Sequence, residues 1–134
     1  QLLSGSNFKY SGVDIFKREI VVGRYGTFDL NKDDFKNFPF KKTFDVVVVS
    51  GVIEYLPVVR VRELLRHIRG ELCTESSKII ISYTNFLHYS RKRETYHPRW
   101  VTVLNLKNIQ KEFQLAGFRV IGSYPSYYLY FVDA

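Results

Sequence analysis

The segment FDVVVVS, residues 44–50, constrains the fold of this chain more than any other part of its sequence. Its four valines, Val46 to Val49, are β-branched and consecutive, without the polar alternation of a strand that has one face in water. Such a run is typical of a strand in a parallel sheet that is covered on both faces. We therefore expect residues 44–50 to form a buried parallel strand.

The rest of the chain alternates between strand-like and helix-like segments. Residues 58–72 are amphipathic, because apolar residues recur at helical spacing while arginines fill the other face. The apolar positions of this helix are Val58, Val61, Leu64, Leu65, Ile68 and Leu72. The other predicted elements are strands at residues 8–16, 21–30 and 78–83, a helix at 106–116, and two closing strands at 118–124 and 127–132.

The ends of the last elements carry their own signals. Asn105 is placed to cap the helix at residues 106–116, and Gly117 is placed to end it. The two closing strands flank Pro125 and Ser126, which predicts an antiparallel hairpin. The fold class is therefore α/β, with a mainly parallel sheet flanked by helices and an antiparallel edge hairpin at the C-terminal end.

Length and composition favour one soluble domain over residues 1–134. A chain of this length with 46% hydrophobic residues has enough material for a single core. No stretch reaches the roughly 18 consecutive apolar residues of a membrane span, so we expect a cytoplasmic protein without a membrane partner. The formal charge of +7 favours anionic partners, although the basic residues are spread along the chain. Cys73 has no cysteine with which to form a disulfide or a metal site.

Three of the predicted strands carry candidate binding residues at their carboxyl ends, where ligands bind to an open parallel sheet. These candidates are Asp14, Asp29 and the stretch from Ser50 to Glu54. A carboxylate at the end of a strand has two acceptor oxygens, and so Asp14 is suited to accept hydrogen bonds from both hydroxyls of a ribose. Asp14 is equally suited to cap the turn that follows it, and the spacing alone leaves both interpretations open.

The order of these segments resembles that of the class I S-adenosylmethionine-dependent methyltransferases. The resemblance runs through YSGVDIF, FDL, FDVVVVSGVIEYL, KIIISYTNF and LNLKNIQKEFQLAGFRVI, and it covers nearly the whole chain. The stretch SYTNFLHYSRKR is also similar to the corresponding part of MetW-type members. The resemblance implies a Rossmann-like sheet and S-adenosylmethionine as the cofactor.

The resemblance also implies a set of binding residues. Asp14 with Ile15 would hold the cofactor ribose, and Asp29 with Leu30 would contact the adenine. The methionine side of the cofactor would be lined by Ser50, Gly51, Val52, Ile53 and Glu54. Tyr55 stands where the family often has a histidine, beside the acceptor substrate.

One part of the family pattern is not found in this sequence. Family members begin with a strand that runs into a glycine-rich GxGxG turn, whereas Ser4-Gly5-Ser6 precedes a strand and is interpreted as a plain connecting turn. The missing strand would lie between the strands at residues 8–16 and 44–50, leaving a gap of roughly 10 Å. Unpaired backbone groups at such a gap are costly. We therefore expect one of three arrangements. The 134 residues are part of a longer parent chain, the two flanking strands pair directly with each other, or another chain supplies the missing strand.

The segment at residues 85–100 combines basic and aromatic side chains, and we interpret it as an acceptor-binding segment. Its candidate substrate contacts are Asn85, His88, Tyr89 and Arg91, and the alternative is a solvated loop. His88 and His97 are candidate general bases, while their spacing, without a nearby cysteine or paired acid, argues against zinc.

Three hypotheses for function follow from the sequence. The first is methyl transfer to a small-molecule or anionic acceptor, by this chain or by an enzyme of which it is the C-terminal part. The second is a non-catalytic methyltransferase-like module that acts in assembly or regulation, as a homo-oligomer or with a strand-donating partner. The third is a basic domain that binds RNA or glycans through residues 85–100.

Overall fold

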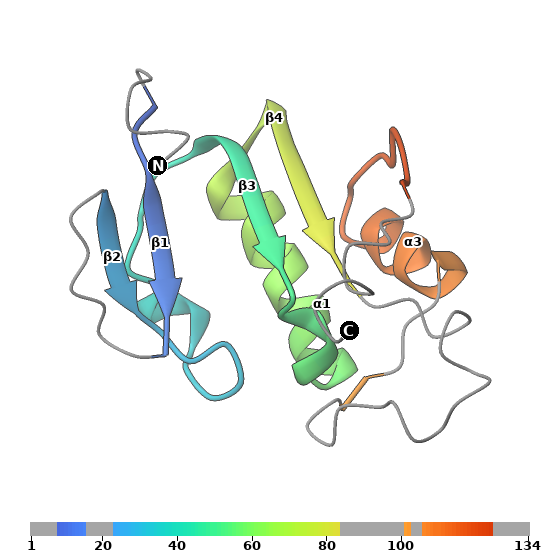
Figure 1. Ribbon diagram of the computed structural model, residues 1–134, viewed down its shortest axis with the longest axis horizontal. Coiled ribbons are helices and arrows are strands. Elements are labelled where there is room, and N and C mark those ends of the chain that lie inside the picture. Colours follow the sequence, from blue (N-terminus) through green and yellow to red (C-terminus); the bar gives the residue numbers. More distant parts are fainter. Residues whose placement is uncertain (1–7, 16–22, 84–100, 103–105, 125–134) are drawn as a thin grey trace, which may run out of the picture.

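The computed structural model of this chain describes residues 8–15, 23–83, 101–102 and 106–124, and it has a mixed α/β fold (Figure 1). The described strands are β1 (Ser11–Asp14), β2 (Arg24–Thr27), β3 (Phe44–Ser50) and β4 (Cys73–Ser82). The described helices are α1 (Val58–His67) and α3 (Leu106–Leu115), with short helical turns η1 (Phe35–Asn37), η2 (Ile53–Tyr55) and η3 (Ile68–Leu72). The predicted α/β class is confirmed, and β3 has the predicted bounds.

The described strands form two separate parallel pairs, β1 with β2 and β3 with β4. In the first pair, Ser11 lies opposite Arg24 and Asp14 lies opposite Thr27. The arrows of all these strands point the same way in Figure 1. Strands β1 and β3 do not pair with each other, so the flanking strands have not closed up as one expectation required. The described residues thus show parallel pairing but not one continuous Rossmann-like sheet.

The β3–β4 pair is covered on one face by α1 (Figure 1). Val47 and Val49 of β3 belong to the packed core of the molecule. Val46, Val48 and Ile80 point to the other face and are 51%, 62% and 57% exposed. The described residues therefore cover one face of this strand, whereas the sequence predicted cover on both faces. A continuous apolar run shows that a strand is apolar on both sides, but only the packing of other elements decides which side is covered.

Helix α1 continues into η3 without a break, and together they span the predicted helix at residues 58–72. Val61 and Leu65 are at most 1% exposed, as the helical pattern predicted. Val58 is 42% exposed, contrary to the prediction, because it begins the helix and lies beyond the packed face. Strand β4 begins directly after η3 at Cys73, which is five residues before the predicted start.

The β1–β2 pair is joined to the core by aromatic rings from the segment that follows β2. Phe28, Phe38 and Phe40 are each 9% exposed or less. The rings of Phe28 and Phe38 meet edge to face, with 5.1 Å between centroids. The centroid of the His67 ring, on α1, lies 4.7 Å from that of the Phe38 ring. The His67 ring is partly buried because it packs on the aromatic segment.

Helix α3 lies beside the β4 side of the molecule and ends as the sequence predicted (Figure 1). Gly117 has a φ angle of 90°, and its N–H donates to the carbonyl of Gln114. The N–H of Phe118 donates to the carbonyl of Phe113, which completes a glycine-dependent helix end. The first closing strand, at residues 118–124, is not a strand in this structure, because no described segment pairs with it. The second, at residues 127–132, and the cap Asn105 lie outside the described residues.

Candidate functional site

The carboxyl ends of the described strands lie at one edge of the molecule, which we call the carboxyl edge (Figure 1). Asp14 is the last residue of β1, and Ser50 is the last residue of β3. Asp29 follows the end of β2 by two residues. Parallel strands bring the residues after their ends to the same edge, and this edge is where ligands bind to such sheets. The structure therefore places the predicted cofactor residues on one side of the fold.

Asp14 is half-buried, and its backbone is tied to the segment after β2. The N–H of Phe28 donates to the carbonyl of Asp14 with an N···O distance of 2.8 Å. Phe28 is 2% exposed, so this hydrogen bond ties the end of β1 to a core residue. Ile15 is 53% exposed just beyond it. The backbone of Asp14 is thus held at a fixed point of the carboxyl edge.

The loop after β2, which we call the Asp29 loop, comprises residues 29–33 and is closed by its own hydrogen bonds. The Asp29 Oδ1 atom accepts the N–H of Asn31 at 2.8 Å. The carbonyl of Asp29 accepts the N–H groups of Lys32 and Asp33. In return, the N–H of Asp29 donates to Asp33 Oδ2 at 2.7 Å. An aspartate at the start of such a turn satisfies the local backbone donors, so this loop has a defined shape.

The loop after β3, which we call the Gly51 loop, comprises residues 51–56. Gly51 has a φ angle of 61°, which only glycine adopts without strain, and it turns the chain from β3 into η2. Ile53 and Glu54 are 0% and 4% exposed, and they anchor the loop in the core. Ser82 Oγ lies 2.8 Å from Ser50 Oγ and accepts the N–H of Gly51 at 3.2 Å.

Hydrogen bonds across the carboxyl edge join these loops. Asn31 Nδ2 in the Asp29 loop donates to the carbonyl of Tyr55 in the Gly51 loop at 3.3 Å. The N–H groups of Val101 and Thr102 donate to the carbonyl of Glu54 at 2.8 and 3.1 Å. The hydroxyl of Thr102 also donates to the carbonyl of Leu56. The Gly51 loop is thus held from two sides.

Sequence reasoning missed several residues that build this edge. Asn31, Ser82, Tyr83 and Thr102 were not among the predicted site residues. Ser82 could have been found, because it ends the strand that pairs with β3 and lies opposite Ser50. Burial raises the pKa of the Tyr83 phenol, which keeps this side chain protonated at the end of β4. The contacts of Asn31 and Thr102 with the Gly51 loop could not be predicted, because no local sequence pattern indicates them.

Some of the predicted site residues lie outside the part of the chain that the structure describes. Asn85, His88, Tyr89, Arg91 and His97 are outside the described residues, so their roles stay predictions. Among the described residues, no group of three or more His, Cys, Asp or Glu side chains is placed to hold a metal ion.

A surface cavity of about 530 Å³ lies beside the Asp29 loop rather than at Asp14 or Gly51. Its lining carries both signs of charge and consists of Lys32, Asp33, Asp34, Phe35, Arg60, Glu63 and Arg66.

Comparison with protein families identifies the chain. The family model described as a methyltransferase domain matches residues 1–123. The chain belongs to the methyltransferase domain family. This membership confirms the resemblance to class I methyltransferases and indicates methyl transfer as the type of reaction. Comparison with curated proteins and with solved structures gives no match. In the described part of this methyltransferase domain, no helix is long and apolar enough to cross a membrane.

Proposed function

We propose that this methyltransferase domain binds S-adenosylmethionine at the carboxyl edge and transfers its methyl group to a small-molecule or anionic acceptor. One structural observation supports this proposal in addition to family membership. The Asp29 loop and the Gly51 loop, which hold the predicted adenine-side and methionine-side residues, are joined at this edge by the hydrogen bond from Asn31 to Tyr55. The two predicted halves of a cofactor site are thereby neighbours in space.

The residues at the edge are suited to this cofactor. Asp14 offers a half-buried carboxylate with two acceptor oxygens, and a ribose offers two hydroxyl donors. Apart from Gly51 and its two chain neighbours, no described residue has an atom within 4 Å of the point that a Cβ on Gly51 would occupy, so a ligand can approach the backbone there. Leu30 and Val52 are half-buried and supply apolar surface beside these polar groups. Polar and apolar surfaces that meet in this way are typical of cofactor sites.

The proposed reaction needs no nucleophile from the protein. When bound, S-adenosylmethionine supplies an electrophilic methyl group on its sulfonium. This chain would bind and orient the two reactants, and a base in the acceptor segment would remove a proton where the acceptor requires it. His88 and His97 are our candidates for that base. Cys73 is not one, because burial raises the pKa of its thiol and keeps it protonated.

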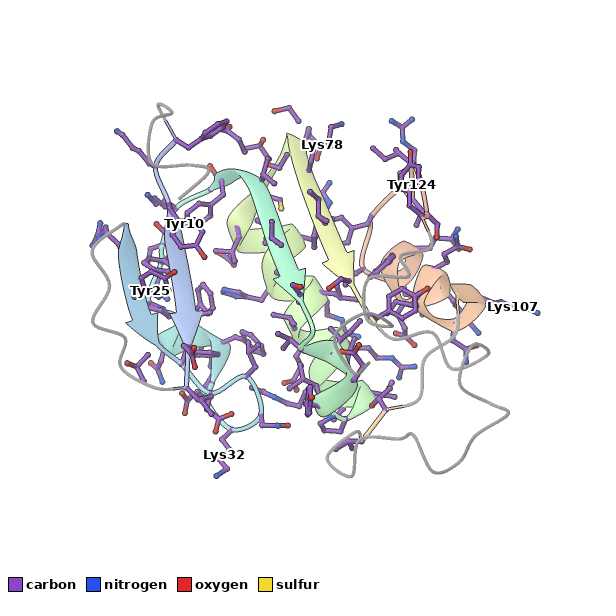
Figure 2. The ribbon with its side chains drawn as sticks, viewed as in Figure 1. Tyr10, Tyr25, Lys32, Lys78, Lys107 and Tyr124 are labelled. Carbon is purple, nitrogen blue, oxygen red and sulfur yellow. The ribbon has the colours of Figure 1, made fainter. Side chains whose placement is uncertain are left out.

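The acceptor is proposed as small or anionic because the chain carries a formal charge of +7. Figure 2 shows Lys32, Lys78 and Lys107 at widely separated places on the molecule. These three lysines do not form a single basic patch of the kind that tracks a nucleic-acid backbone. The placement of these three lysines thus gives no support for an extended RNA as the acceptor, and we propose a small anionic one.

A calorimetric titration with S-adenosylhomocysteine tests the proposal. We expect binding by the wild-type chain and a loss of about tenfold or more in affinity for Asp14→Asn, since a charged hydrogen bond contributes about 1.5–3 kcal/mol. Asp45→Asn is the matched control, because Asp45 is an exposed aspartate near the other end of β3. A folded wild-type sample that shows no binding at millimolar ligand would contradict the proposal. That outcome would favour the non-catalytic module.

A further inference from the structure

Arg60 connects α1 to the Asp29 loop, although the helical pattern places it on the polar face with the other arginines. Its side chain is only 15% exposed. Arg60 Nε donates to the carbonyl of Leu30, and Nη2 donates to the carbonyl of Asp33, each at 2.7 Å. A single guanidinium thus holds two carbonyls that lie three residues apart in the loop.

The guanidinium is itself held in place from other sides. Arg60 Nη1 donates to the carboxylate of Glu63, one turn further along α1. The guanidinium carbon lies 4.7 Å from the centroid of the Phe35 ring, within the range of a cation–π contact. Planar geometry and several donors in a fixed arrangement are properties of arginine that lysine does not share.

Arg62 and Arg69 have different surroundings from Arg60. Arg62 is 49% exposed and forms a two-pronged ion pair with Glu112 of α3, at 2.9 Å for each N···O distance. Arg69, in the η3 turn that continues α1, contacts Glu75 and the carbonyl of Gly117. The partners of Arg62 and Arg69 thus belong to α3, β4 and the turn after α3. Arg60 differs from these two arginines because it binds the Asp29 loop.

We propose that Arg60 is a positioning residue for the cofactor site. It fixes the carbonyls of Leu30 and Asp33, and it thereby holds the Asp29 loop in the shape in which Asp29 and Leu30 meet the adenine. This inference rests on the proposed function, because Asp29 and Leu30 meet an adenine only if the carboxyl edge binds this cofactor. Asn31 completes the arrangement by joining the same loop to Tyr55.

The experiment compares Arg60→Lys with Arg62→Lys by titration with S-adenosylhomocysteine. Both changes keep the charge, but only the first removes the planar group that contacts two carbonyls. We expect Arg60→Lys to weaken S-adenosylhomocysteine binding by about tenfold. Coupling between two sites changes affinity by about 5- to 150-fold, and this value is in the lower part of that range. Arg62→Lys should bind as the wild type does. Equal affinity for the wild type and Arg60→Lys would overturn the inference.

A second ligand separates positioning from a general loss of stability. S-inosylhomocysteine has a carbonyl oxygen in place of the adenine amino group, and in the proposed site that amino group would donate a hydrogen bond to the Asp29 carboxylate. The wild type should prefer S-adenosylhomocysteine, and Arg60→Lys should reduce this preference, whereas mere destabilisation would leave the ratio of affinities unchanged. An unchanged ratio would therefore overturn the inference even if affinity falls. Failure of the wild type to bind either ligand would instead count against the proposed function.

A third variant keeps the test decisive if Arg60→Lys does not fold. Phe35→Leu removes the ring beneath the guanidinium and leaves its hydrogen-bond acceptors in place. We expect this variant to weaken S-adenosylhomocysteine binding by roughly threefold, as for a partly exposed cation–π contact. It should also lower the preference over S-inosylhomocysteine. Wild-type affinity together with a wild-type ratio in a folded Phe35→Leu sample would argue against a role for the Arg60 geometry.

Discussion

The two parallel strand pairs are held in place by different forces. The β3–β4 pair packs against α1 through aliphatic side chains, and Ile53, Val61 and Leu65 are at most 1% exposed. The β1–β2 pair is short, and none of its residues is fully buried. It is joined to the rest by aromatic rings after β2 and by the hydrogen bonds of Arg60 and Asn31.

This difference bears on the proposed site. The Gly51 loop lies on the aliphatic side and is anchored by buried residues, so its position depends on the whole core. The Asp29 loop lies on the other side and depends on a few directional contacts. Single substitutions should therefore change stability most on the β3–β4 side and ligand binding most on the β1–β2 side. The following predictions test this contrast, beginning with the largest effect.

Leu65→Ala should destabilise the protein by about 2–5 kcal/mol, because it leaves a cavity where a fully buried leucine was. The free energy of unfolding from chemical denaturation measures this loss. Val59→Ala in the same helix is the control, since Val59 is 60% exposed and its loss should cost less than about 0.5 kcal/mol. Similar losses for the two variants would contradict the assignment of the core to this face of α1.

Phe38→Leu should cost about 1 kcal/mol, because it keeps apolar volume but removes the ring contacts with Phe28 and His67. The same denaturation experiment gives the value. If this variant loses as much stability as Leu65→Ala does, then the aromatic segment is as central to the core as α1. The proposed contrast between the two sides would then fail.

The stability of the protein should fall as the pH is lowered from 6.5 towards 5. Burial is the main cause that lowers the pKa of His67 from its usual 6.5, while Glu71 raises it and Lys41 lowers it. The unfolded chain therefore binds this proton at a higher pH than the folded chain, and folding loses free energy below about 6.5 until His67 is also protonated in the folded state.

Denaturation curves across this pH range measure the effect. The control is His67→Gln, in which the free energy of unfolding should depend less steeply on pH between 6.5 and 5. The pKa of Glu112, lowered mainly by its hydrogen bond to Arg62, affects stability below its usual value of 4.5 and so outside this window. An equal slope in the wild type and in His67→Gln would show that His67 is not the group responsible.

Val48→Thr should change the free energy of unfolding by less than about 0.5 kcal/mol, because Val48 is 62% exposed. Val49→Thr, one residue along the same strand, should cost distinctly more, since it places a hydroxyl in the core at a position that is 8% exposed. The difference between the two variants measures how one-sided the burial of β3 is. Equal losses would mean that both faces of the strand are covered.

Much of the secondary structure could be predicted from the sequence, because it depends on local patterns. The bounds of β3 follow from its continuous β-branched run, and the span of α1 with η3 follows from helical periodicity. The end of α3 follows from Gly117, which adopts the positive φ that ends a helix. The early start of β4 could not be predicted, because Thr74 to Ser77 form a polar stretch held by contacts such as that from Ser77 to the Phe44 carbonyl.

The sequence alone determined the order of the elements, the family and the residues that follow each strand, because these are properties of neighbouring positions in the chain. The tertiary structure decided which face of β3 packs against α1, and it decided that Arg60 of α1 is partly buried. It also brought Asn31 to Tyr55 and Arg60 to Leu30 across 24 and 30 residues of chain. Contacts of this range depend on how the whole chain packs, and for that reason no local pattern of residues records them.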